Sequence, residues 1–171
     1  FDGAAWLSST RPALLEELLA VEGIRDKVRV VQPADLPISI ASQGTGMDRL
    51  LAAVAAWRRA KCDVLVADLG TAWTLDATTA DGVFLGGAIG PGIALQENAL
   101  ASACPHLASP SSEPSGGIPQ NTADAVAEGI RSSLALALNG LSWAYQKEFS
   151  GEPQSFLCGG DAGKLSPWLG P

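Results

Sequence analysis

The amino-acid sequence predicts an α/β fold built on a mixed β-sheet. Val64–Ala67 is a continuous apolar run, typical of a strand buried on both faces, and leucines recur at helical spacing elsewhere in the chain. Hydrophobic residues make up 47% of the 171 residues and charged residues only 17%, against roughly 25% charged in typical globular chains. This composition excludes a disordered chain and fits one domain of ordinary size, or two small lobes sharing a core.

The first third of the chain predicts two helices and one strand. Thr10 is expected to cap a helix over residues 11–22, which carries a leucine stripe and a proline in its first turn. Val28–Val31 is a short strand. Residues 32–46 contain two prolines and two glycines and are predicted to form a loop. A second amphipathic helix is expected over residues 47–61.

The centre of the chain predicts a run of strands followed by a helix. Trp73–Thr78 is expected to form the strand after Val64–Ala67, with Asp68 ending the first strand. Ala80-Asp81-Gly82 is a hairpin signal because Asp-Gly tolerates positive φ. Val83–Ile89 is then a third strand, and Pro91-Gly92 begins a helix that runs to about Ala103.

The last third predicts one long helix and one strand. Residues 105–121 are rich in Pro, Ser and Gly and are expected to be a surface loop. Thr122 is expected to cap a helix through about Phe149. Leucines lie around much of its girth, as in a helix buried on several sides, either in one lobe or between subunits. Ser155–Cys158 is a strand, Gly159-Gly160 a turn, and Asp161–Trp168 a short helix.

Charge and cysteine usage exclude several classes of protein. Eighteen acidic and eleven basic residues give a net charge of −7, so we expect no nucleic-acid or anionic-membrane partner. The three cysteines lie far apart, which argues against a disulfide framework or a zinc knuckle and favours the reducing cytoplasm. The sequence has a single histidine, His106, and no apolar run long enough to predict a transmembrane helix.

The segment Asp68-Leu69-Gly70-Thr71 follows the predicted buried strand. The Asp68 carboxylate would face a cleft, Gly70 permits a tight turn with outward N–H groups, and Thr71 adds a hydroxyl. Amide donors and a hydroxyl suit an oxyanion such as phosphate, and a carboxylate beside them can hold the neutralising cation. The alternative is an ordinary turn within a hairpin.

Three further motifs lie at predicted helix starts. Asp48 could accept the proton of a substrate hydroxyl, and Arg49 could bind a substrate carboxylate; alternatively Asp48 is a helix-dipole partner and Arg49 a solvated surface charge. Gly159-Gly160-Asp161 would let the backbone approach a flat ligand, or would form a turn with a helix cap. Asn121-Thr122 lies at the start of the predicted long helix, and taken alone it is an ordinary N-cap.

Taken in order, these motifs resemble the type III pantothenate kinase family, which includes the Bvg accessory factors. The resemblance runs from about Ser8 to Leu169. The matching residues are Gly46-Met47-Asp48-Arg49; Asp68-Leu69-Gly70-Thr71-Ala72 with Thr74 and Asp76; Asp81-Gly82, Phe84, Gly86-Gly87, Ile89 and Pro91-Gly92; Asn121-Thr122; and Gly159-Gly160-Asp161-Ala162.

The resemblance implies an actin-like, ribonuclease H-like ATPase fold with two lobes, residues 1–61 and residues 62–171, and a homodimer. It implies ATP-dependent phosphorylation of pantothenate with Mg²⁺ and a monovalent cation, K⁺ or NH₄⁺. Asp48 corresponds to the general base and Asp68 to the cation ligand. The pantothenate-binding residues would be Gly46, Met47, Asp48, Arg49 (on the carboxylate) and Thr122. The ATP-binding residues would be Gly70, Thr71, Gly159, Gly160 and Asp161.

The sequence also departs from the family pattern. No D-x-G-N-T phosphate loop precedes Ser8, and the chain stops soon after the last motif, so we expect it to be incomplete at both ends. Gln120 stands where the family commonly has arginine, and the family's tyrosine-containing stretch is not recognisable in Ile38–Gln43. Two alternatives therefore stay open: a non-catalytic accessory relative, and a kinase of the same fold acting on another small carboxylate or a sugar.

Overall fold

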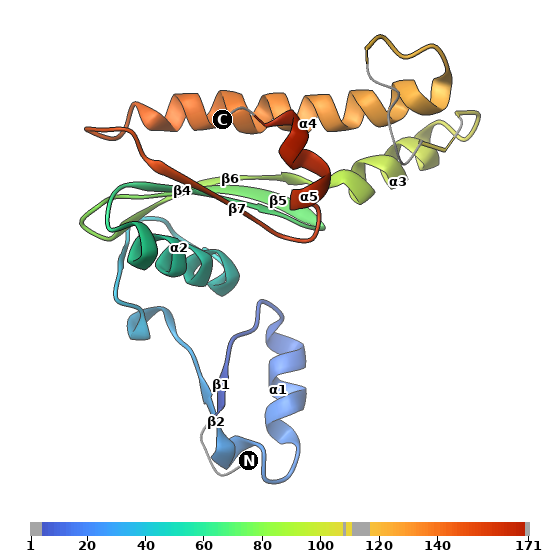
Figure 1. The fold of residues 1–171 in the computed structure, drawn as a ribbon. Coiled ribbons are helices and arrows are strands. Elements are labelled where there is room, and N and C mark those ends of the chain that lie inside the picture. The colour runs from blue at the N-terminus through green and yellow to red at the C-terminus, as the bar shows by residue number, and fades with distance from the viewer. Residues whose placement is uncertain (1–4, 108, 111–116, 170–171) are drawn as a thin grey trace.

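The fold centres on a five-stranded mixed sheet of strand order β3-β6-β5-β4-β7 (Figure 1). The computed structural model describes residues 5–107, 109–110 and 117–169, so part of the predicted loop 105–121 lies outside the described residues. The strands are β3 (Ser39–Ile40), β4 (Val64–Leu69), β5 (Ala72–Thr78), β6 (Val83–Pro91) and β7 (Gln154–Cys158). Strands β4, β5 and β6 form an antiparallel meander, while β7 runs parallel to β4 and β3 parallel to β6. The predicted mixed sheet is confirmed.

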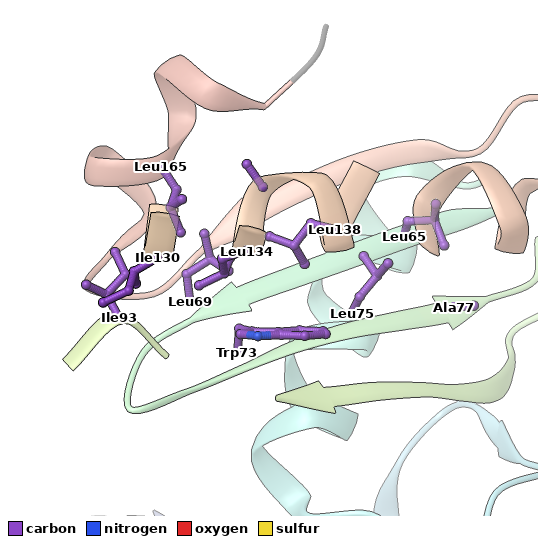
Figure 2. Close-up of a cluster of buried hydrophobic side chains, with 11 residues drawn as sticks. Leu65, Leu69, Trp73, Leu75, Ala77, Ile93, Ile130, Leu134, Leu138 and Leu165 are labelled. Atoms are coloured by element: carbon purple, nitrogen blue, oxygen red, sulfur yellow. The ribbon is translucent and has the colours of Figure 1, made fainter. Parts of the chain in front are cut away.

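Helices cover both faces of this sheet (Figure 1). The helix α2 (Met47–Ala60) packs on one face, and α4 (Thr122–Gln146) with the start of α3 (Ile93–Ala103) and α5 (Ala162–Leu165) packs on the other. Alternate residues of β4 and β5, such as Leu65, Leu69 and Leu75, join Leu134 and Leu138 of α4 in one buried cluster (Figure 2). Because side chains alternate along a strand, Asp68, Thr74 and Asp76 lie on the α2 face.

A smaller unit lies apart from the sheet on its α2 side (Figure 1). Strands β1 (Ala5–Leu7) and β2 (Val28–Val30) pair in parallel, and α1 (Pro12–Ala20) connects them. Strand β1 was not predicted. The division into lobes 1–61 and 62–171 stays a prediction; the structure packs α2 and β3 with the five-stranded sheet. Short 3₁₀ turns occur at Arg25–Lys27, Pro33–Asp35 and Ser166–Trp168.

Two predicted helix caps are wrong. Arg11, not Thr10, occupies the N-cap of α1, and the Arg11 backbone N–H donates to Ser9 Oγ at 3.0 Å. Asn121, not Thr122, caps α4, because the Asn121 side chain accepts the Asp124 backbone N–H at 2.9 Å. Helix α1 begins one residue later than the predicted cap requires and α4 one residue earlier, so a different residue occupies the cap in each case.

Long-range pairing corrects two strand predictions. Strand β3 lies within the predicted loop 32–46, because the edge of β6 offers backbone partners: the Ser39 N–H donates to the Gly82 carbonyl at 2.8 Å. Strand β4 continues through Asp68 to Leu69, since Asp68 pairs with Thr74 on β5 and with Cys158 on β7. Asp68 is therefore a strand residue rather than the end of the strand.

The long helix α4 is only half buried within one chain. Leu134 and Leu138 are buried against the sheet, but Leu136 is 70% exposed and Trp143 is 65% exposed. Within one chain the expected burial is thus met on one face only, and burial between subunits stays a prediction. Within the described ranges, no helix combines the length and apolar character that crossing a membrane requires.

Candidate functional site

Polar side chains line the α2 face of the two central strands. Asp68 lies directly opposite Thr74 in the β4–β5 register, and Asp76 lies two residues further along β5, opposite Val66. Directly opposed side chains on one sheet face have Cβ atoms roughly 4.5–5.5 Å apart. Alternation along β5 therefore gathers a carboxylate, a hydroxyl and a second carboxylate on the face that α2 covers.

The first turn of α2 is attached to this face by an ion pair. The Arg49 Nε–H donates to both carboxylate oxygens of Asp76, at 3.1 Å and 3.0 Å, and Nη2 also donates to Oδ1. The Asp76 side chain is 2% exposed and that of Arg49 13%. The hydrogen bonds from Arg49 to Asp76 raise the pKa of the guanidinium, outweighing the burial that lowers it. The interpretation of Arg49 as a solvated surface charge is therefore wrong.

Asp48 lies beside Arg49 and is exposed. Its Oδ1 accepts the Arg49 backbone N–H at 2.9 Å. Gly46, the N-cap, leaves room for it, because a Cβ at position 46 would come within 2.5 Å of Asp48 Oδ1. Met47 packs against the buried cluster around Phe84 and so seats the start of the helix. The arrangement presents an accessible carboxylate on a fixed helix end.

The Gly159 loop lies against the end of β4. Gly159 has φ +95°, and a Cβ there would lie 2.3 Å from the Leu69 carbonyl oxygen and 2.5 Å from Asp68 Oδ1. The Asp161 backbone N–H donates to the same Leu69 carbonyl at 2.9 Å. The structure therefore brings Asp68 and the Gly159–Asp161 segment together, although they are far apart in the sequence.

The Gly70–Thr71 turn is held from the other side by the start of α3. The Gly92 N–H donates to the Thr71 carbonyl at 3.0 Å, and a Cβ at position 92 would lie 2.0 Å from the Gly70 carbonyl oxygen. Thr71 itself is exposed. Its side chain is therefore accessible to a ligand.

Cys158 is a site neighbour that sequence reasoning missed. It pairs with Asp68 across the β4–β7 ladder. Burial raises the pKa of its thiol, and the charge of Asp68 and a hydrogen bond to that carboxylate raise it further. No local pattern signals this contact, because it depends on how β7 pairs with β4.

Asp68 and Thr74 fit a hard cation. The Thr74 hydroxyl is buried and has no hydrogen-bond partner among the described residues, and it lies opposite the Asp68 carboxylate. Carboxylate and hydroxyl oxygens suit hard cations such as K⁺ or Mg²⁺ better than soft metals. Over the same described residues, no three His, Cys, Asp or Glu side chains are grouped to hold a metal ion.

Two features lie away from this face. Thr122 is exposed in the first turn of α4, in the opposite layer, and no described contact links it to Gly46–Arg49. A cavity of about 560 Å³ opens between α4 and β7, lined by residues such as Leu138, Asn139 and Ser155. It therefore lies on the opposite face of the sheet from Asp68 and Asp76.

Comparison with known proteins decides the family. The family profile described as type III pantothenate kinase matches residues 2–143. The chain belongs to the type III pantothenate kinase family. Its sheet accordingly belongs to the actin-like ATPase fold.

Curated relatives carry the same name. The type III pantothenate kinase of Chromobacterium violaceum is 40% identical over 125 residues, covering 72% of this chain and 52% of that protein. That of Thermomicrobium roseum is 34% identical over 158 residues, covering 90% of this chain and 58% of that protein. The chain thus spans about half the length of these relatives.

A solved structure supports the fold. The crystal structure of a Baf family protein from Campylobacter jejuni superposes with a TM-score of 0.71 at 24% identity, covering 99% of this chain and 74% of that one. At this identity the likeness establishes the fold alone.

Proposed function

We propose that this protein transfers the γ-phosphoryl group of ATP to the hydroxyl of pantothenate, giving 4'-phosphopantothenate, the first step of coenzyme A biosynthesis. Family membership supports the reaction class. The observation that carries the assignment is the Arg49–Asp76 ion pair. It seats the helix end bearing Asp48 on the same sheet face as Asp68.

In this proposal Asp48 is the general base. It accepts the proton of the pantothenate hydroxyl as the oxygen bonds to the γ-phosphorus and the bond to the ADP oxygen breaks. Gly46–Arg49 hold pantothenate. Thr122 lies in the opposite layer of the same chain, so in this proposal it would reach pantothenate from the second copy of the homodimer. Asp76 uses only the Nε and one Nη2 donor of Arg49, which leaves three of the five guanidinium N–H groups for the substrate carboxylate.

The nucleotide lies on the Asp68 side in this proposal. Backbone N–H groups of Gly159 and Gly160, with Gly70, the Thr71 hydroxyl and Asp161, would contact ATP. The Gly70 N–H itself donates to the Ala72 carbonyl at 3.1 Å within the turn, so the expectation that it points outward to phosphate is wrong. Asp68 and Thr74 would hold the monovalent cation, and Mg²⁺ would arrive with the phosphates. Bound cations offset phosphate charge. A protein of net charge −7 needs this compensation in order to bind ATP.

Assembly and location are also proposals. We expect a homodimer, supported by the exposed apolar side chains of Leu136 and Trp143 on α4. Light scattering at a mass of one chain would contradict it. The three cysteines are free, which fits a reducing cytoplasm.

Pantothenate-dependent ADP release from ATP tests the function. We expect Asp48→Asn to lower kcat by about 10²–10⁴-fold, with an unchanged melting temperature because Asp48 is exposed. Asp81→Asn, at an exposed aspartate of the β5–β6 turn, is the matched control and should retain activity. A folded protein that releases no pantothenate-dependent ADP contradicts the assignment. Tight binding of a protein partner without ATP binding would then favour the accessory role. Phosphorylation of another small carboxylate or of a sugar would favour the alternative kinase.

Asp68→Ala tests the cation site. We expect this variant to lose most of the stimulation of turnover by K⁺ or NH₄⁺, because it removes the charged ligand beside Thr74. Titration of each salt against turnover, with Na⁺ keeping the ionic strength constant, measures the response. An unchanged cation dependence would remove Asp68 from this role.

A further inference from the structure

Asp76 is a buried carboxylate for which the proposed mechanism has no direct use. It lies on the central strand β5 and its side chain is 2% exposed. A buried carboxylate is costly unless its oxygens are satisfied. Here both oxygens accept hydrogen bonds from one residue, Arg49, which is 27 positions away in the sequence.

The neighbouring strand is shaped to leave room for this carboxylate. Gly87 on β6 lies directly opposite Asp76. A Cβ at position 87 would lie 1.9 Å from the Leu75 carbonyl oxygen and 2.7 Å from Asp76 Oδ1. Gly87 thus has a structural reason: a side chain there would collide with the β5 backbone and crowd the Asp76 carboxylate.

The ion pair determines how Arg49 is presented. A free arginine side chain samples many rotamers, whereas two N–H groups bound to one buried carboxylate fix the plane of the guanidinium. The Nε and Nη2 edge faces the sheet. The remaining donors, including both on Nη1, have no described protein partner and stay available to a ligand.

We propose that Asp76 is a positioning residue for substrate selection: it holds Arg49 in the direction that binds a carboxylate on the acceptor substrate. The proposal rests on the function proposed above. Asp76 touches neither ATP nor acceptor in it. Its effect on turnover passes through Arg49 and should therefore appear only for acceptors that carry a carboxylate.

A substrate comparison tests this role. ADP release is measured with pantothenate and with its neutral analogue in which a primary alcohol replaces the carboxylate. In the wild-type protein we expect a higher kcat/KM for pantothenate. In Asp76→Asn we expect KM for pantothenate to rise roughly tenfold, with kcat and the constants for the neutral analogue nearly unchanged, so that the preference for the carboxylate is lost.

Thr78→Val is the matched control. Thr78 lies two residues along β5 on the same face, is fully buried, and its hydroxyl has no partner among the described residues. This variant should keep the preference for pantothenate. A purely structural role of Asp76 would lower activity toward both acceptors equally, and that outcome overturns the proposal.

Two further outcomes are decisive. If circular dichroism shows that Asp76→Asn does not fold, Asp76→Glu replaces it in the test because it retains the charge. We expect this variant to lose part of the preference for pantothenate. An unchanged preference in a folded Asp76→Glu protein overturns the proposal. A wild-type protein that phosphorylates neither acceptor overturns the proposed function itself, and the positioning role with it. Wild-type activity with an unaltered preference in Asp76→Asn refutes the positioning role alone.

Discussion

Gly159→Ala is the substitution for which the structure makes the sharpest prediction. The added Cβ would lie 2.3 Å from the Leu69 carbonyl oxygen and 2.5 Å from the Leu69 nitrogen. These are backbone atoms of a central strand and cannot swing aside, so the loop must move. At φ +95° a non-glycine residue also costs about 1–2 kcal/mol. Loss of the hydrogen bond from the Asp161 N–H to Leu69 adds about 0.5–1.5 kcal/mol.

We therefore expect Gly159→Ala to lower the free energy of unfolding by about 1.5–3.5 kcal/mol, the sum of the two costs. For a chain of this size that lowers the melting temperature by roughly 3–14 °C. Hydrogen exchange of the Asp161 amide should accelerate, because the displaced loop exposes it. Thermal unfolding and exchange measured by mass spectrometry report the two effects separately.

Gly160→Ala is the control from the neighbouring position. A Cβ there meets no atom within 4 Å, and its φ is not in the left-handed region. Its effect should stay within about 0.5 kcal/mol. If the two variants have the same melting temperature and the same Asp161 protection, the Gly159 loop does not dock on β4 as described.

Two further predictions concern the polar face. Arg49→Met should destabilise the protein by about 3–5 kcal/mol because it leaves Asp76 buried and unpaired. In urea unfolding, the double variant Arg49→Met/Asp76→Leu should lose less unfolding free energy than the two single variants lose together. Additive losses would contradict an energetic coupling between Arg49 and Asp76. Asp68→Asn should speed alkylation of Cys158 by iodoacetamide at pH 8, since only the thiolate reacts and removing the charge lowers a thiol pKa that Asp68 raises. Peptide mapping should show no change in the alkylation rate of Cys62. An unchanged alkylation rate at Cys158 would show that Asp68 does not influence its thiol.

Much of the fold could be predicted from the sequence because its signals are local. The stripe of α2 and the apolar run of β4 repeat with the period of their own element. The Asp81-Gly82 turn depends on the conformational freedom of Gly82, which has φ +76°. Trp57 of α2 then donates from Nε1 to the Ala80 carbonyl at 2.8 Å and packs over this turn. Signals of this kind need only a few neighbouring residues.

Errors occurred where a distant partner competes with local preference. Strand β3 forms within a segment rich in Pro and Gly because β6 offers it an edge. The helix caps are a local error instead: each lies one residue from its predicted position, and the acceptors, Ser9 and Asn121, are two and three residues from their donors. Helix periodicity could not show that Leu136 and Trp143 are exposed in a single chain, because the number of covered faces depends on what packs around the helix.

The sequence by itself determined the order of most elements, the family and the positions of Asp48 and Gly159 at element ends. Only the tertiary structure decided that Arg49 is bound by Asp76 and that Cys158 lies beside Asp68. The physical reason is the separation along the chain over which each kind of interaction acts. Turn chemistry and periodicity act over one or two turns of chain, whereas a partner across a sheet is selected by strand register and burial, to which the whole core contributes.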